Sequence, residues 1–187
     1  MPHYAPNMTR EQKAYLAVGQ FLLHFAGMET ALNNMLTRLL EMKNLEGLVV
    51  TSNIDMRGKI YIVQTALNMR PITEDDWLKE ARKDLKSVVT MTEKRNILAH
   101  NIFLPHADGV EFHLVRAKGK LDLPEELWTD EIFDGHYAEM DRLTLRLKEI
   151  TDALMQHRAS AVLAALQSGS FLPKGGMFGL AGDLTAA

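Results

Sequence analysis

Long stretches of this chain place apolar residues at helical spacing, and this periodicity restricts the fold more than any other feature of the sequence. The first stretch begins after Thr9, a typical N-cap residue, and extends to about Lys43. Counted in sevens, it carries two stripes: Tyr15, Leu22, Glu29 and Leu36 in one, and Val18, Phe25, Leu32 and Leu39 in the other. The stretch predicts a long amphipathic helix with one carboxylate, Glu29, in an otherwise apolar seam.

Two further helices are predicted before the first change of pattern. One starts at about Ser52 or Asp55 and ends at Met69, ahead of Pro71. The other starts at Thr73, where acidic residues in the first turn suit the positive end of a helix dipole. Its stripes are Leu78, Leu85, Thr92 and Ala99, and Ala81, Val88, Arg95 and Ile102. Arg95 therefore falls where the pattern otherwise places core residues.

The pattern changes after Pro105, and residues 109–115 alternate like a short strand. Helical spacing returns from about Thr129 or Asp130 and continues to Leu166. We predict an all-α fold, an antiparallel four-helix bundle that forms a single domain over residues 1–167. A short β-hairpin or irregular insertion at about 105–128 precedes the last long helix, and a Gly-rich C-terminal tail occupies 168–187.

Composition narrows the classes of function. The 187 residues are 47% hydrophobic and 24% charged, with a formal net charge of -3, which argues against a general nucleic-acid coat but permits a local basic cleft. Without cysteine the chain has no disulfides, thiolate nucleophiles or iron–sulfur clusters. No apolar run approaches the roughly 20 residues of a membrane span, and the first residues lack the pattern of a signal peptide. We therefore expect a cytoplasmic protein with no membrane contact.

The residues best suited to chemistry are Arg95, Asn96 and His100, near the end of the third predicted helix. Asn96 and His100 are four residues apart and share one helix face, and the long Arg95 side chain can reach them or turn inward. A histidine can exchange a proton with a 2′-hydroxyl or a leaving oxygen, an arginine can hold a phosphate, and an asparagine can orient either group. These residue types suit the cleavage of a phosphodiester.

The segment 93–100, Glu-Lys-Arg-Asn-Ile-Leu-Ala-His, resembles the Arg-x(4–6)-His signature of HEPN domains, including the polar residue directly after the arginine. The stretch Phe25 to Asn33 is similar to the first-helix pattern of many members of that family. The resemblance covers the chain from about Thr9 to His100 and, more loosely, the last helix. Asn101 follows the histidine where relatives often carry glycine.

The resemblance implies a metal-independent endoribonuclease that acts as a homodimer, in which two copies of the motif face one another across a cleft. It implies that His100 is the acid or base, that Arg95 binds the phosphate and that Asn96 orients the pair. The products would be a 2′,3′-cyclic phosphate and a 5′-hydroxyl. Many relatives are toxins or antiphage proteins, so a protein antitoxin or regulator is an expected partner beside RNA.

Structural explanations compete with these roles. Arg95 can pair with Glu29 across two helices, and we expect this pairing ahead of one from Arg57 or Lys59. His100 at a helix end can interact with the dipole alone. The whole bundle can also be a non-catalytic interaction or regulatory module of the same fold.

We predict no cofactor and no metal ion. His100, His106 and His113, with Glu111 near the last of them, show no recognised ligand spacing on one element. The chain also contains no phosphate-binding loop or dinucleotide fingerprint.

Overall fold

The computed structural model describes residues 7–68, 76–114, 116–117 and 121–167. Contacts within the chain form two compact units, residues 1–150 and 151–187. The N-cap predicted at Thr73 and the Gly-rich tail at 168–187 lie outside the described residues. The division into a domain and a tail at residue 167 stays a prediction.

The described part of the chain is predominantly helical, as the periodicity predicts. Its helices are α1 (Arg10–Leu39), α2 (Asn44–Ser52), α3 (Met56–Asn68), α4 (Asp76–His100) and α5 (Asp130–Gln167). Thr9 caps α1 as predicted: its hydroxyl accepts a hydrogen bond from the Gln12 amide at 3.2 Å, and the Gln12 side chain accepts one from the Thr9 amide at 2.9 Å. None of the described helices combines the length and apolar character needed to cross a membrane.

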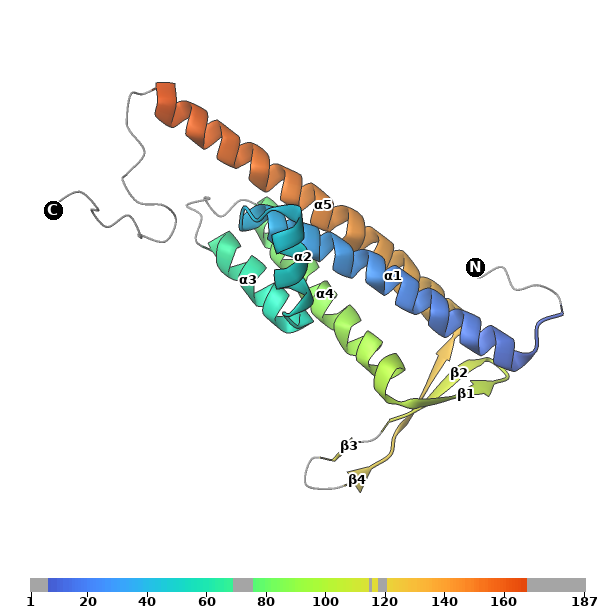
Figure 1. Ribbon diagram of the computed structural model, residues 1–187. Coiled ribbons are helices and arrows are strands. Elements are labelled where there is room, and N and C mark those ends of the chain that lie inside the picture. Colours follow the sequence, from blue (N-terminus) through green and yellow to red (C-terminus); the bar gives the residue numbers. More distant parts are fainter. Residues whose placement is uncertain (1–6, 69–75, 115, 118–120, 168–187) are drawn as a thin grey trace. The chain divides into compact units, whose positions relative to one another are not determined.

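The directions of the long helices differ from those of the predicted antiparallel bundle. The Tyr137 hydroxyl donates to the Ala17 carbonyl at 2.7 Å, and His24 Nδ1 lies 2.7 Å from an Asp141 carboxylate oxygen. Residue numbers therefore rise together along α1 and the first part of α5, so these two helices run in the same direction (Figure 1). The sequence predicted opposite directions because helical periodicity identifies a helix but not the path that the chain takes between helices.

The insertion predicted as a hairpin or irregular segment is larger and more regular than expected. Strands β1 (Ile102–His106), β2 (Gly109–His113) and β5 (Glu125–Thr129) form an antiparallel sheet in the order β1-β2-β5. The short strands β3 (Arg116–Ala117) and β4 (Leu121–Asp122) pair with each other between β2 and β5 in the sequence. Gly109 has φ 150°, and a Cβ there would collide with the Trp128 carbonyl oxygen, so the turn into β2 requires glycine.

One face of the sheet packs on the helices through aromatic side chains. Trp128 on β5 is 1% exposed, and its ring centroid lies 4.9 Å from that of Phe112, 5.4 Å from that of Phe133 and 5.8 Å from that of Phe21. The Trp128 Nε1 donates to Glu126 Oε1 at 2.7 Å, and Lys94 of α4 binds the same oxygen at 2.9 Å. This cluster joins the sheet to α1, α4 and α5.

A buried carboxylate joins α4 to α5. Asp84 is 3% exposed, and its two oxygens accept hydrogen bonds from Arg142 Nη1 at 2.8 Å and from Arg146 Nε at 3.0 Å. Its hydrogen bond to Glu139, and to a smaller extent its bond to Asp84, raise the pKa of Arg142 above its ordinary value. The same bond from Arg142 lowers the pKa of Glu139. The two arginines are partly exposed to water, whereas the Asp84 carboxylate is buried and needs the arginines to offset the loss of its hydration.

We predict that Asp84→Ala lowers the free energy of unfolding by about 2 kcal/mol, because two charge-assisted hydrogen bonds are lost while the arginines regain water. Urea denaturation followed by circular dichroism measures the change. Glu80→Ala, an exposed acid on the same helix, is the control and should shift stability by no more than about 0.5 kcal/mol. Equal effects of the two substitutions would show that the Asp84 contacts add nothing to stability.

His136 packs against the same aromatic cluster, with its ring centroid 4.8 Å from that of Trp128 and its Nε2 buried without a hydrogen-bond partner. Burial, followed by the nearby charge of Lys94, lowers the pKa of His136 from 6.5. As the pH falls through 6.5, the unfolded chain binds this proton before the folded protein does. The free energy of unfolding therefore decreases between pH 6.5 and the lower pKa of the folded state.

We therefore expect the melting temperature of the wild type to fall as the pH is lowered from 7.5 into the range below about 6.5. His136→Phe keeps an aromatic ring and removes this proton, so its melting temperature should depend less on pH across that range. His106→Gln, a partly exposed position at the end of β1, should keep the wild-type dependence. A pH profile unchanged by His136→Phe would contradict the role of burial.

Candidate functional site

The last two turns of α4 carry Arg95, Asn96 and His100. The helix ends at His100, and the Asn101 side-chain amide donates to the Ile97 carbonyl at 2.9 Å, which satisfies a carbonyl that the helix end leaves without an amide partner. The histidine is therefore the last helical residue, at the negative end of the dipole, as expected.

The three motif residues differ in their surroundings. Asn96 and His100 are exposed, one helical turn apart, whereas Arg95 is half-buried. The Arg95 guanidinium lies 5.9 Å from the centroid of the Phe25 ring on α1, and its Nη1 donates to Asn96 Oδ1 at 3.4 Å. The arginine is thus held between an aromatic face and the neighbouring asparagine.

A groove of about 450 Å³ lies beside the motif. It is lined by residues of α1, of the α2–α3 connection, of the start of α3 and of α4: Phe25, Glu29, Ile54, Asp55, Met56, Arg57, Thr92, Arg95 and Asn96. The structure therefore brings Arg95, Asn96 and Glu29 to one groove, and His100 follows Asn96 by one turn of α4. Arg57 is a further cation in this groove that the sequence analysis ranked only as a partner for Glu29.

The partner of Glu29 is Lys59, not Arg95 as we expected. Lys59 Nζ lies 2.6 Å from Glu29 Oε1, and the lysine is 3% exposed whereas the glutamate side chain is 38% exposed. Lys59 stands one turn before the buried Val63 on α3, and this spacing was the sequence signal that it faces inward. The heptad stripes placed the charges of Glu29 and Arg95 near the core, but they could not show which basic side chain of a neighbouring helix contacts Glu29.

The other acid of the groove has a local structural role. Asp55 precedes α3, and its Oδ1 accepts a hydrogen bond from the Gly58 amide at 2.7 Å, which is an N-cap contact. Both groove carboxylates are therefore engaged, Asp55 by a helix end and Glu29 by a lysine. The guanidinium groups of Arg57 and Arg95 are the groove cations that can attract a phosphate.

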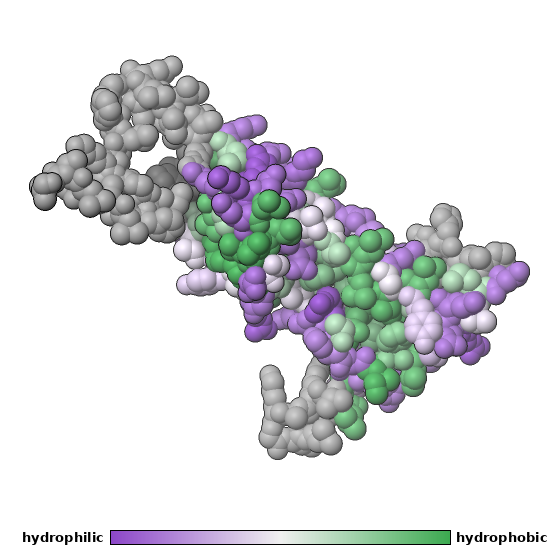
Figure 2. Space-filling model, in the orientation of Figure 1, coloured by the Kyte–Doolittle hydropathy of each residue, from purple (hydrophilic) through white to green (hydrophobic). Residues whose placement is uncertain are grey.

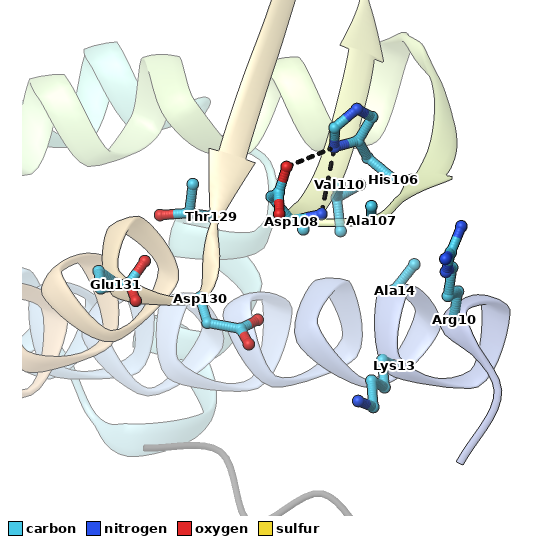
Figure 3. A pocket seen from close by; sticks show the side chains of 11 residues that line it. Arg10, Lys13, Ala14, His106, Ala107, Asp108, Val110, Thr129, Asp130 and Glu131 are labelled. Carbon is cyan, nitrogen blue, oxygen red and sulfur yellow. Dashed lines mark hydrogen bonds and ion pairs between the residues drawn. The ribbon is translucent and has the colours of Figure 1, made fainter.

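A second hollow of about 420 Å³ lies between the start of α1, the β1–β2 turn and the start of α5 (Figure 3). It mixes charges of both signs: Arg10, Lys13, Asp108, Asp130 and Glu131. The Asp108 amide donates to His106 Nδ1 at 3.2 Å, and a hydrogen bond from Thr129 lowers the pKa of Glu131. These contacts are local to a turn and a helix start, so this hollow is the weaker candidate.

The structure groups a different set of side chains as candidate metal ligands. Within the described residues, Glu111, His113 and Glu125 offer donor atoms that all lie within 4.8 Å of one another. His100 and His106 do not belong to this group. Glu125 could not be added to this group from the sequence, because spacing along the chain does not reveal which strand lies beside β2.

Searches with this chain found no matching protein-family model, no matching curated protein and no matching solved structure. The HEPN resemblance therefore depends on the motif and its place at the end of α4.

We predict unequal losses of stability for the two members of the Glu29–Lys59 pair. Glu29→Leu leaves a buried ammonium group without its carboxylate and should lower the free energy of unfolding by about 2 kcal/mol. Lys59→Met keeps the buried stem and leaves Glu29 partly in water, so it should change stability by less than about 1 kcal/mol. Urea denaturation measures both.

The double variant Glu29→Leu, Lys59→Met is the matched control, and it should recover most of the stability lost in Glu29→Leu. A loss that persists in the double variant would point to another partner for the glutamate, such as Arg95.

Proposed function

We propose that this protein is a HEPN-type, metal-independent endoribonuclease of the cytoplasm, and that its helices form a variant of the HEPN bundle. The observation that carries the proposal is the solvent exposure of Asn96 and His100 beside a groove that contains Arg95. A histidine that is exposed at a helix end can reach an RNA backbone, and a guanidinium on the preceding turns of the same helix can hold the phosphate.

The reaction that fits these groups is an internal transesterification. His100 removes the proton from a 2′-hydroxyl, the 2′-oxygen bonds to phosphorus, and the bond from phosphorus to the 5′-oxygen breaks. The leaving 5′-oxygen takes up a proton, so the products are a 2′,3′-cyclic phosphate and a 5′-hydroxyl. Arg95 stabilises the charge that develops on the phosphate, and Asn96 orients it.

One copy of the motif supplies one histidine, whereas this reaction needs a base at the 2′-oxygen and an acid at the 5′-oxygen. We therefore propose a homodimer in which His100 of each copy performs one of the two proton transfers. A toxin or antiphage role, restrained by a protein antitoxin, is consistent with such an activity.

A non-catalytic interaction module is the second candidate, and one surface favours it. Apolar side chains of α2 and α3 are exposed: Leu45 78%, Leu48 64%, Val49 63% and Tyr61 70%. Figure 2 shows a hydrophobic patch over α2. A patch of this kind is typical of a protein–protein contact.

We predict that the purified protein cleaves RNA in the presence of EDTA and that His100→Ala lowers the rate by roughly 10²- to 10⁴-fold, because general acid–base catalysis is lost. Arg95→Lys should also lower the rate, since lysine cannot provide the planar fork of donors. Gel analysis of a labelled RNA, with identification of the 2′,3′-cyclic phosphate end, measures cleavage.

His106→Ala is the control for this experiment, because it removes a partly exposed histidine at the end of β1 and should leave the rate unchanged. Cleavage by His100→Ala at the wild-type rate would exclude His100 from the mechanism. An active species that is monomeric by light scattering would exclude the composite site.

A further inference from the structure

The sheet has two faces of different character. Val110 and Phe112 of β2 and Trp128 of β5 are buried on the face that packs on the helices. The alternate residues form the opposite face, which we call the outer face. The backbone register places six of them in two neighbouring rows across the three strands: Leu104, Glu111 and Leu127 in one, and Ile102, His113 and Glu125 in the other.

Three side chains with atoms that could ligate a metal lie together on the outer face, toward the end of the sheet where β2 ends and β5 begins. Glu111 and His113 are two residues apart on β2 and so project from the same side, and Glu125 of β5 is the direct register partner of His113. Glu111 Oε1 lies 3.3 Å from His113 Nε2, and Glu125 Oε1 lies 3.7 Å from His113 Nδ1. The imidazole therefore stands between two carboxylates from adjacent strands.

The closest of these contacts lacks hydrogen-bond geometry. His113 Nε2 is buried and has no hydrogen-bond partner, although Glu111 Oε1 is only 3.3 Å away. Two ligands that each bind a tetrahedral zinc ion at about 2.1 Å are about 3.4 Å apart, so this separation suits a shared ion. Glu125 is 63% exposed, which leaves its side chain free to turn its carboxylate toward the same ion.

We propose that Glu111, His113 and Glu125 bind a divalent metal ion of the zinc and manganese class. One imidazole and two carboxylates are a donor set that both ions accept, and water completes the coordination. The exposed apolar side chains of Ile102 and Leu104 adjoin the cluster on β1, and such neighbours limit the access of water and strengthen the charge attraction. The site is separate from the proposed ribonuclease motif and does not require it.

The experiment uses the full-length chain without a histidine tag, treated with EDTA and dialysed at pH 7.5. Isothermal titration with Zn²⁺ and, separately, with Mn²⁺ measures binding. We expect one ion per chain for at least one of the two metals. His113→Gln and Glu111→Gln should each weaken that binding by roughly tenfold or more.

His106→Gln is the matched control, because His106 also lies on the sheet next to a carboxylate, that of Asp108 at 3.7 Å, but has no second carboxylate as an ion-pair partner among the residues that the structure describes. This control should bind the metal as the wild type does. Thermal unfolding of each variant checks that it is folded, and the metal should raise the melting temperature of the wild type but not of His113→Gln.

A second measurement needs no variant: Mn²⁺ should broaden the NMR signals of the amides of residues 111, 113 and 125 before those of residue 106. The absence of a stoichiometric ion, equal binding by His113→Gln, or broadening centred on another segment would each overturn the proposal. RNA cleavage is measured with EDTA present, so the failure of one proposal leaves the other unaffected.

Discussion

The packing of Trp128 against helices and sheet fixes the rotation of α4, and the exposure of the motif depends on it. Lys94 of α4 binds Glu126, which also holds the indole nitrogen, and the lysine amine lies 5.3 Å from the centroid of the Trp128 ring. Residues two apart on a helix point in directions about 160° apart, so Asn96 faces away from the sheet when Lys94 faces it. His100, six residues after Lys94, lies about 120° from it and is exposed as well.

The same arrangement separates two kinds of chemistry along a short length of chain. β1 begins two residues after His100, and its first residue, Ile102, is the register partner of His113. The helix end offers a histidine with arginine and asparagine nearby, which suits a phosphate. The outer face of the sheet offers a histidine between two carboxylates, which repels a phosphate and suits a cation. The proposed anionic substrate and the proposed metal ion would therefore be attracted to different parts of this region.

The sequence predicted the elements whose signals are local, and it failed where the decisive contact is distant. The Thr9 cap and the start of α5 near Asp130 were recognised because capping and periodicity act within a few residues. Helix α2 was missed because its apolar side chains are exposed and only two of its residues are buried, Gly47 and Thr51, so it shows no inward seam. Lys59 as the partner of Glu29 and Glu125 as the neighbour of His113 depend on tertiary register, which spacing along one element does not contain.

The structure gives a physical reason for the order of residue types in the motif. Arg95 rests on the Phe25 ring, so its guanidinium is already restrained, and little conformational entropy remains to be lost when it binds an anion. Asn96 accepts from Arg95 through Oδ1, which leaves its amide hydrogens for a phosphate oxygen. An aspartate in its place would hold the arginine more strongly but would neutralise it and donate nothing, and a lysine in place of Arg95 would lose the planar contact with the ring. The pair thus combines a restrained cation with an available donor on the turns that precede the histidine, and this combination is what the proposed phosphate chemistry would use.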